Sequence, residues 1–119
     1  MKIYKLKFMK YLYGASVQGI QDFIFETNKL TEIVGASEIV EHICTSFFKE
    51  CVEAFQIENL LIGAAGNIKY LFGDIASCEK LVYDFPKKVL KIAPGITISQ
   101  AVVKVNGEVS NSHIQALEF

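Results

Sequence analysis

Glycine, glutamine and serine residues lie near the N-terminal ends of two predicted helices, where a ligand could approach the backbone. Gly19, Gln21 and Phe25 lie in the stretch GIQDFIF, and Ser37 closes the stretch Gly-Ala-Ser. A glycine at a helix start lets the backbone approach a phosphate or ribose, and a helix N-terminus favours anions. Gln21 can hydrogen-bond a base edge or a hydroxyl, Phe25 can stack on a base, and Ser37 offers a hydroxyl beside exposed backbone amides.

Structural roles compete with each of these binding roles. Gly19 can serve only the turn, Phe25 can belong to the core, and Ser37 is a suitable N-cap with or without a ligand. Asp22 suits the first turn of a helix as a favourable charge. Capping does not require Gln21.

The composition indicates one folded domain with no strong affinity of its own for nucleic acid. The chain has 119 residues, of which 51% are hydrophobic, and it carries 12 basic against 13 acidic residues for a net charge of −1. This length fits one domain, and the near-neutral charge argues against autonomous RNA binding. No apolar run approaches the roughly 20 residues that span a bilayer. We expect a cytoplasmic protein with no membrane partner.

The three cysteines are expected to be small core residues rather than disulfide partners or metal ligands. Cys44 and Cys51 are seven apart on a predicted helix, which separates them by about 10 Å, too far for a disulfide. Cys78 is remote from both, and neither His42 nor His113 has the spacing of a zinc ligand. The sequence therefore predicts no metal centre.

Hydrophobic periodicity divides the chain into alternating strands and helices. The predicted strands cover residues 3–17, 59–65, 68–72 and 96–105, and the predicted helices cover residues 19–28, 37–55 and 75–92. The first strand is expected to end near residues 14–16, the strand at 59–65 to be buried, and Pro86 to kink or split its helix. This order predicts an α+β, ferredoxin-like fold with helices on one face of a four-stranded antiparallel sheet.

The C-terminal residues predict a helix that has barely begun. Ser110, Asn111 and Ser112 have the character of a helix cap, and residues 113–119 follow as the start of a helix. We therefore expect residues 1–119 to be a single palm-like domain that is a fragment or truncated form of a larger protein.

Four motifs in order resemble the N-terminal palm domain of the large polymerase-like subunit of type III CRISPR effector complexes. They are GIQDFIF at 19–25, KLTEIVGAS at 29–37, NLLIGAAGNIKYLF at 59–72 and APGITISQAVV at 93–103. The resemblance covers roughly residues 10–105. In that family two palms hold two ATP molecules between them, and the second palm carries a Gly-Gly-Asp-Asp hairpin that binds metal and makes cyclic oligoadenylate for antiviral defence.

This chain departs from a catalytic palm at both places where metal-binding acids are needed. The first strand ends Tyr13-Gly14-Ala15-Ser16, and the hairpin reads Ala64-Ala65-Gly66-Asn67, so neither place offers a carboxylate. Two-metal chemistry depends on such acids. The resemblance therefore implies a domain that is catalytically silent alone, binds no cofactor alone, and contributes half of an ATP site, with Mg or Mn in a composite site.

The resemblance also implies the partners of the domain. They are a catalytic palm domain, the other CRISPR effector subunits, ATP, and guide or target RNA indirectly. A homodimer is left open.

Two alternatives remain. The chain could be an interaction-only ferredoxin-like module that docks through an uncovered sheet face, for which the candidates are Tyr11, Tyr13, Tyr70 and Phe72. It could instead be an autonomous minimal nucleotide cyclase that uses Asp22 and Asp74 as metal ligands.

Overall fold

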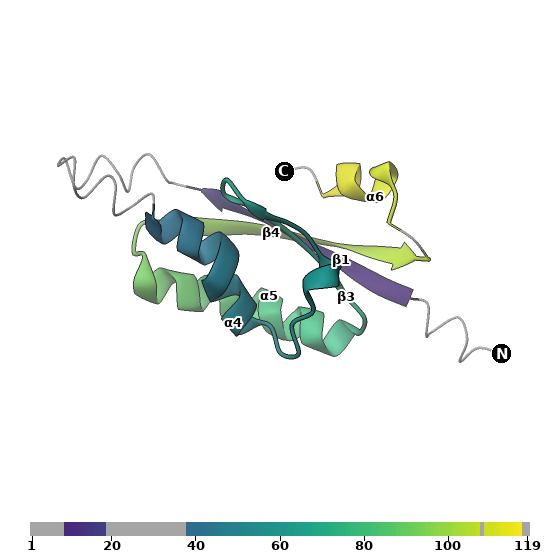
Figure 1. Ribbon diagram of the computed structural model, residues 1–119, viewed down its shortest axis with the longest axis horizontal. Coiled ribbons are helices and arrows are strands. Elements are labelled where there is room, and N and C mark those ends of the chain that lie inside the picture. The colour runs from purple at the N-terminus through teal and green to yellow at the C-terminus, as the bar shows by residue number, and fades with distance from the viewer. Residues whose placement is uncertain (1–8, 19–37, 108, 118–119) are drawn as a thin grey trace.

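Four strands form one antiparallel sheet in the order β2-β3-β1-β4. The computed structural model describes residues 9–18, 38–107 and 109–117 of the chain. The strands are β1 (Met9–Gln18), β2 (Leu60–Ala64), β3 (Asn67–Phe72) and β4 (Thr97–Asn106). All three strand pairs are antiparallel. This strand order, with two helices packed on one face of the sheet (Figure 1), confirms the predicted ferredoxin-like arrangement.

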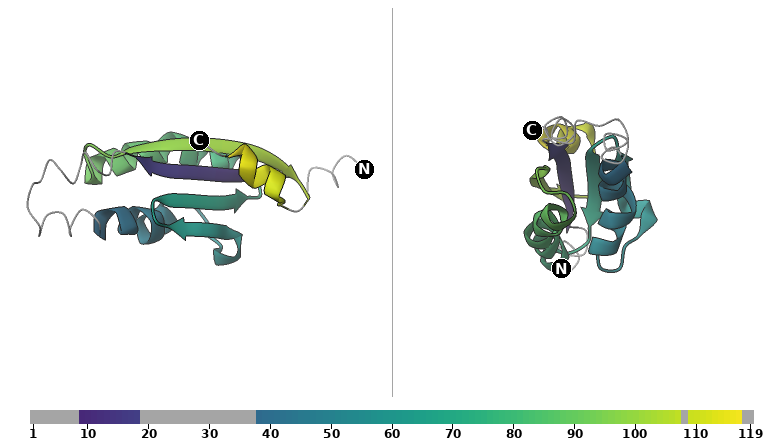
Figure 2. Two further views of the ribbon diagram at one scale, coloured as in Figure 1. Left: turned by 90° about the horizontal axis from the view of Figure 1, so that it is seen from above. Right: turned by 90° about the vertical axis from the view of Figure 1, so that its left-hand side faces the viewer.

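The two longest helical segments cover one face of this sheet (Figure 1). The first begins in the described chain at residue 38 and continues through the π-helical segment η1 (Ile43–Phe47) into α4 (Phe48–Cys51). The second is α5 (Ile75–Ile92). A single 3₁₀ turn, η2 (Ile57–Asn59), precedes β2. Figure 2 shows α5 running along β1 and β4, whereas α4 lies beside the β2–β3 hairpin.

Helix α5 forms over the predicted residues because its sequence combines a good cap with a regular apolar stripe. Its buried residues, Cys78, Leu81, Phe85 and Val89, recur at three- and four-residue intervals and face the sheet. Asp74 is the N-cap, and its carboxylate accepts a hydrogen bond from the Ser77 amide at 2.9 Å. The bounds agree with the prediction of 75–92.

Pro86 neither splits α5 nor ends it, because a side chain from the sheet replaces the hydrogen bond that proline removes. Proline has no N–H, so it cannot donate to the carbonyl of Val82 one turn earlier. The side-chain amide Nε2 of Gln100 on β4 donates to that carbonyl at 3.0 Å. The Oε1 of Gln100 accepts from the hydroxyl of Tyr13 at 2.5 Å. Gln100 thus bridges β1, β4 and the middle of α5.

The helix predicted over residues 37–55 ends four residues early and is irregular within. Val52 already has an extended backbone (φ −93°, ψ 120°), and Ala54 adopts a positive φ of 52°. In the π segment the Thr45 hydroxyl donates to the Glu41 carbonyl at 2.7 Å. A side chain that bonds the preceding turn in this way competes with the regular backbone ladder. The helix is therefore irregular at the π segment and gives way to an extended backbone at Val52.

Two expectations about the sheet are wrong. The strand at β2 is not buried, because it is an edge strand with Leu61 and Ile62 exposed to solvent. The proposed docking residues Tyr13, Tyr70 and Phe72 are buried on the helix-covered face, and Tyr11 packs against the same core. Alternation along a strand separates two faces but does not say which one the helices cover.

The opposite face of the sheet carries a smaller apolar cluster beneath the short helix α6 (Asn111–Ala116). Leu12, Val105 and Leu117 are buried there together. Ser110 caps α6 as the sequence predicts, in a capping box in which the Ser110 amide donates to Nδ1 of His113 at 2.9 Å. Figure 1 shows α6 on the side of the sheet away from α5.

Candidate functional site

The two places where a catalytic palm needs acids are adjacent in this structure. Ser16 near the end of β1 pairs with Asn67 at the start of β3, and Ala15 pairs with Ile68. The amide of Val17 donates to the carbonyl of Gly66 in the hairpin turn at 2.8 Å. The end of β1 and the turn of the β2–β3 hairpin therefore form one local site, although 49 residues separate Val17 from Gly66 in the chain.

The hairpin turn is tight, and an alanine occupies one of its two left-handed positions. Ala65 and Gly66 have φ values of 54° and 78°, so both central residues are left-handed. This is the pattern of the two-residue turns that match the twist of a hairpin. Glycine tolerates such a φ, but alanine pays a steric cost of about 1–2 kcal/mol for it. Asn67, whose amide Nδ2 donates to the Ala65 carbonyl at 3.3 Å, supports the turn from the first position of β3.

Strand β2 lies in backbone contact with the π segment of the covering helix. A Cβ atom built on Gly63 would lie 2.8 Å from the carbonyl oxygen of Cys44, closer than real Cβ contacts. Only glycine therefore fits at Gly63 without a shift of the backbone. The hairpin is thereby held against the helix that runs back toward residue 38.

Polar side chains form a row across three strands on the sheet face away from α5. Ser16 pairs with Asn67 on one side and with Ser99 on the other, so the three residues share this face. Lys69 follows in the next row, opposite Gly14. All four polar residues are partly exposed. The row lies beside the apolar cluster under α6 and leaves this end of the face polar.

Hydroxyl, amide and ammonium groups suit the recognition of a phosphorylated ligand rather than two-metal catalysis. Among the residues that the structure describes, no cluster of three or more histidine, cysteine or acidic side chains could hold a metal ion. The thiol of Cys44 under the hairpin is buried, and desolvation raises its pKa. Burial is also the largest cause that raises the pKa of Cys78 to about 11. Protonated thiols of this kind are poor nucleophiles.

The cysteines are free in the structure, as expected. Cys44 and Cys78 are buried core residues, and Cys51 is partly buried at the edge of the same core. Burial confirms the core role for Cys44 and Cys78.

The four residues predicted to bind a nucleotide, Gly19, Gln21, Phe25 and Ser37, lie outside the described residues, as do Asp22 and the helix predicted at 19–28. Their roles stay predictions. The described chain does place their neighbours. Gln18 ends β1 one residue before Gly19, next to the hairpin end of the sheet, and residue 38 begins the helix that contacts β2.

Asp74, the second acid of the cyclase alternative, lies at the other end of β3 from the hairpin turn. Its carboxylate is engaged as the N-cap of α5. A carboxylate in that position cannot join the hairpin turn in a metal site.

Sequence reasoning missed the polar row. Ser16 and Asn67 were noted only as positions without acids, and Ser99 and Lys69 were not singled out. The signal is the cross-strand register, which aligns residues 16, 67 and 99, and no local motif contains it.

Solved structures share this fold at low sequence identity. A Csm1–Csm4 cassette in complex with cA4 matches with a TM-score of 0.72 and 14% identity over 98% of this chain and 19% of that chain. A Csm1–Csm4 subcomplex of the type III-A CRISPR–Csm interference complex matches with a TM-score of 0.68 and 18% identity, over 82% of this chain and 15% of that chain. A structure of Csm1 from T. onnurineus matches with a TM-score of 0.62 and 16% identity, over 81% of this chain and 15% of that chain.

The described chain has the fold of a part of Csm1. The resemblance to the large subunit of type III CRISPR complexes is therefore confirmed at the level of fold. The chain spans about a fifth of the length of the Csm1 chains that it matches. No protein-family model and no curated protein matches the sequence. No helix of the described residues is both long and apolar enough to cross a bilayer.

Proposed function

We propose that this chain is a non-catalytic palm of a type III CRISPR effector large subunit that supplies half of an ATP site to a catalytic palm. The observation that carries the proposal is the polar row Ser16–Asn67–Ser99, with Lys69 beside it, at the end of the sheet where a catalytic palm would have its acids. In this arrangement the row and Lys69 contact phosphates or ribose. The metal, Mg or Mn, is held by the acids of the partner palm.

Three features support a site in which this chain contacts the nucleotide and the partner palm holds the metal. The Csm1 structures with the same fold include cassettes in complex with AMPPNP and with one ATP. The ammonium of Lys69 and the hydroxyls of Ser16 and Ser99 can donate hydrogen bonds to phosphate oxygens without a metal of their own. Gln18 and Thr97 pair at the end of β1 and β4 and are both exposed, and Gly19 follows Gln18 in the chain. In the proposed role Gln21 and Phe25 contact the base, while Gly19 and Ser37 bring backbone amides to the phosphates.

The proposed partners are the catalytic palm and the other effector subunits, with guide or target RNA acting indirectly. The product of the composite site is cyclic oligoadenylate, and the biological role is antiviral defence in the cytoplasm. The chain alone makes no product in this proposal, because it supplies no acid to the metals.

The test mixes this chain with a separately made catalytic palm, ATP and Mg²⁺ or Mn²⁺, and measures nucleotide affinity and product formation. Gln21→Ala and Lys69→Gln are expected to weaken ATP binding in the mixture. For Lys69→Gln, loss of one charge-assisted hydrogen bond of about 1.5–3 kcal/mol corresponds to a loss of about tenfold to a hundredfold in affinity. For Gln21→Ala, loss of a neutral hydrogen bond to the base, about 0.5–1.5 kcal/mol, corresponds to about twofold to tenfold. Lys104→Gln is the matched control, because Lys104 lies on the helix-covered face near the other end of β4. If ATP binds the mixture no better than the catalytic palm alone, the half-site is refuted.

The interaction-only module is the second candidate. Exposed apolar side chains on β2 and along α5, which include Leu61, Ile62 and Tyr83, favour it. A mixture that forms a complex without any change in ATP affinity would support it.

A further inference from the structure

The outer edge of β4 is unpaired among the residues that the structure describes. β4 is the last strand of the sheet, and its ten residues pair with β1 along its whole length on the inner side. In the described chain no strand pairs with its other side. Residues 97–103, TISQAVV, carry no charge, and Lys104 follows them. Native proteins cover such edges or break them with charges, because free backbone N–H and C=O groups recruit another strand.

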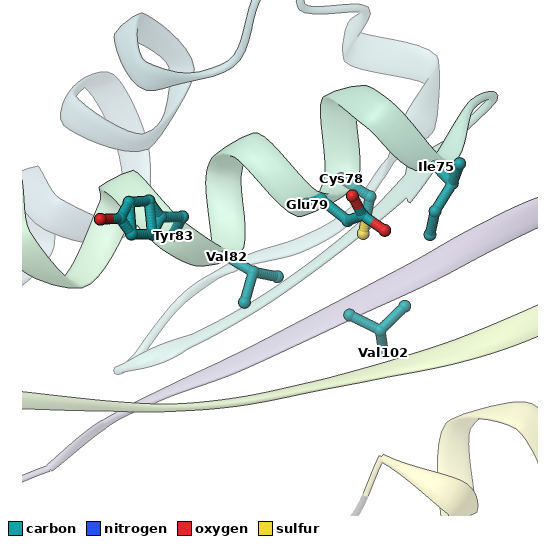
Figure 3. Close-up of a pocket in the computed structure, with 6 residues that line it drawn as sticks. All are labelled: Ile75, Cys78, Glu79, Val82, Tyr83 and Val102. Carbon is teal, nitrogen blue, oxygen red and sulfur yellow. The ribbon is translucent and has the colours of Figure 1, made fainter.

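An apolar groove of about 520 Å³ runs beside this edge, between β4 and α5. Figure 3 shows Val102 on β4 and Ile75, Val82 and Tyr83 on α5 around it. Tyr83 is 62% exposed and Val102 is 41% exposed. Two such side chains beside a free strand edge form one continuous surface rather than scattered exposed residues.

Large apolar and charged side chains on the exposed side of α5 are spaced almost equally on either side of Tyr83. Large apolar side chains lie at Ile75, Tyr83 and Leu90, which are eight and seven residues apart. Glu79 and Lys87 lie four residues before and after Tyr83, and the Lys87 ammonium sits 3.5 Å from the centre of the Tyr83 ring. A copy of α5 running antiparallel about Tyr83 would place Leu90 across from Ile75, and Lys87 across from Glu79.

The middle of β4 lies beside the middle of α5. Gln100 is the middle residue of the uncharged stretch 97–103, and its side chain bonds the carbonyl of Val82, the neighbour of Tyr83. One twofold axis can therefore pass by Gln100 and Tyr83 together. Antiparallel pairing of β4 with its own copy about this axis places Ile98 opposite Val102. Strands pair about 4.8 Å apart, and α5 lies over β4 and β1, so the two α5 helices come to about the 8–10 Å of packed helices.

We propose that β4 pairs antiparallel with β4 of a second copy of this chain, which joins the two sheets and packs the two α5 helices against each other. The occupant is a second copy because strand, apolar flank and charges all complement themselves about one axis. The paired stretch of β4 includes Ser99 of the polar row, but Ser99 lies on the sheet face away from α5, so the α5 contacts of the dimer do not use the nucleotide half-site.

Sedimentation equilibrium of the 119-residue chain from about 1 µM to about 300 µM tests the proposal. The chain is expected to form a concentration-dependent dimer. Val102→Lys places a charge at the interface and is expected to weaken the dimer at least about tenfold. Ile57→Lys is the matched control, since Ile57 is equally apolar and more exposed but precedes β2. A urea unfolding curve for each variant shows that the monomer still folds.

Two further variants test the predicted register. Glu79→Lys and Lys87→Glu should each weaken the dimer, and the two together should restore it. Tyr83→Cys should form a disulfide between copies under mild oxidation, whereas Ile57→Cys should not. A chain that stays monomeric at every concentration, or a dimer that Val102→Lys leaves unchanged, overturns the proposal. A charge exchange that does not restore the dimer overturns the register and with it the argument for a second copy.

Discussion

The bridge that Gln100 makes beneath Pro86 leads to a sharp prediction about stability. Gln100→Met keeps most of the side-chain volume but removes both hydrogen bonds. The Tyr13 side chain is completely buried, so its hydroxyl loses its acceptor without access to water. The Val82 carbonyl loses its side-chain donor as well. Leaving a buried polar group unsatisfied costs about 1–3 kcal/mol, and the Val82 group is only partly buried. We expect Gln100→Met to lower the free energy of unfolding by about 2–4 kcal/mol.

A double-mutant cycle with Pro86→Ala separates this explanation from a general packing defect. In Pro86→Ala the new backbone N–H can donate to the Val82 carbonyl, so the Gln100 amide is no longer its substitute donor. Gln100→Met should then cost about 1 kcal/mol less than in the original chain. Urea unfolding followed by circular dichroism measures all four corners of the cycle. An equal cost in both backgrounds, within about 0.5 kcal/mol, would refute the reasoning.

Three further predictions concern single positions. Ala65→Gly should raise the free energy of unfolding by about 1 kcal/mol, because φ is 54° there, and a lower midpoint in urea would contradict this. Gly63→Ala should lower it by about 1–3 kcal/mol because its Cβ would meet the Cys44 carbonyl at 2.8 Å, and thermal unfolding of the variant checks the loss. The pKa of Cys78 is about 11 in the folded chain against 9.0 unperturbed, so the stability that this thiol contributes is full below pH 9 and is lost as the pH rises through 11. Plots of the free energy of unfolding against pH should therefore run parallel for the original chain and for Cys78→Ala below pH 9, and the original chain should lose stability faster above pH 9. Plots that stay parallel up to pH 11 would count against the assignment.

The sequence predicted those elements whose local chemistry and packing agree. Helix α5 has a cap at Asp74, a stripe that faces the sheet and a stop at Pro94, and its predicted and observed bounds coincide. Strand β4, with its run of β-branched residues, lies within one residue of the prediction at each end. The short helix after Ser110 is also where its cap indicated.

The features for which prediction and structure differ depend on residues that are distant in the sequence. Nothing near Pro86 reveals that Gln100 will bond the Val82 carbonyl, so proline alone predicts a kink. The apolar composition of β2 suggests burial, but its place at the edge of the sheet follows only from the strand order. The faces of Tyr13 and Tyr70 were assigned to the wrong side for the same reason.

The candidate site also has one part that local motifs predict and one part that they do not. Motifs indicate Gly19, Gln21, Phe25 and Ser37, which lie outside the described residues. The polar row at residues 16, 67 and 99 exists only because three strands align in register. Local sequence can predict where a helix begins, but a site assembled across strands needs the pairing itself.

The close approach of Gly63 to the Cys44 carbonyl has a mechanical consequence. Two backbones in contact, with no side chain between them, have little room to slide, so the hairpin and the helix behind it move as one body. The amide of Val17 adds the end of β1 to that body through the Gly66 carbonyl. A displacement of the hairpin turn would therefore carry the helical backbone around Cys44 with it, rather than be absorbed within the turn.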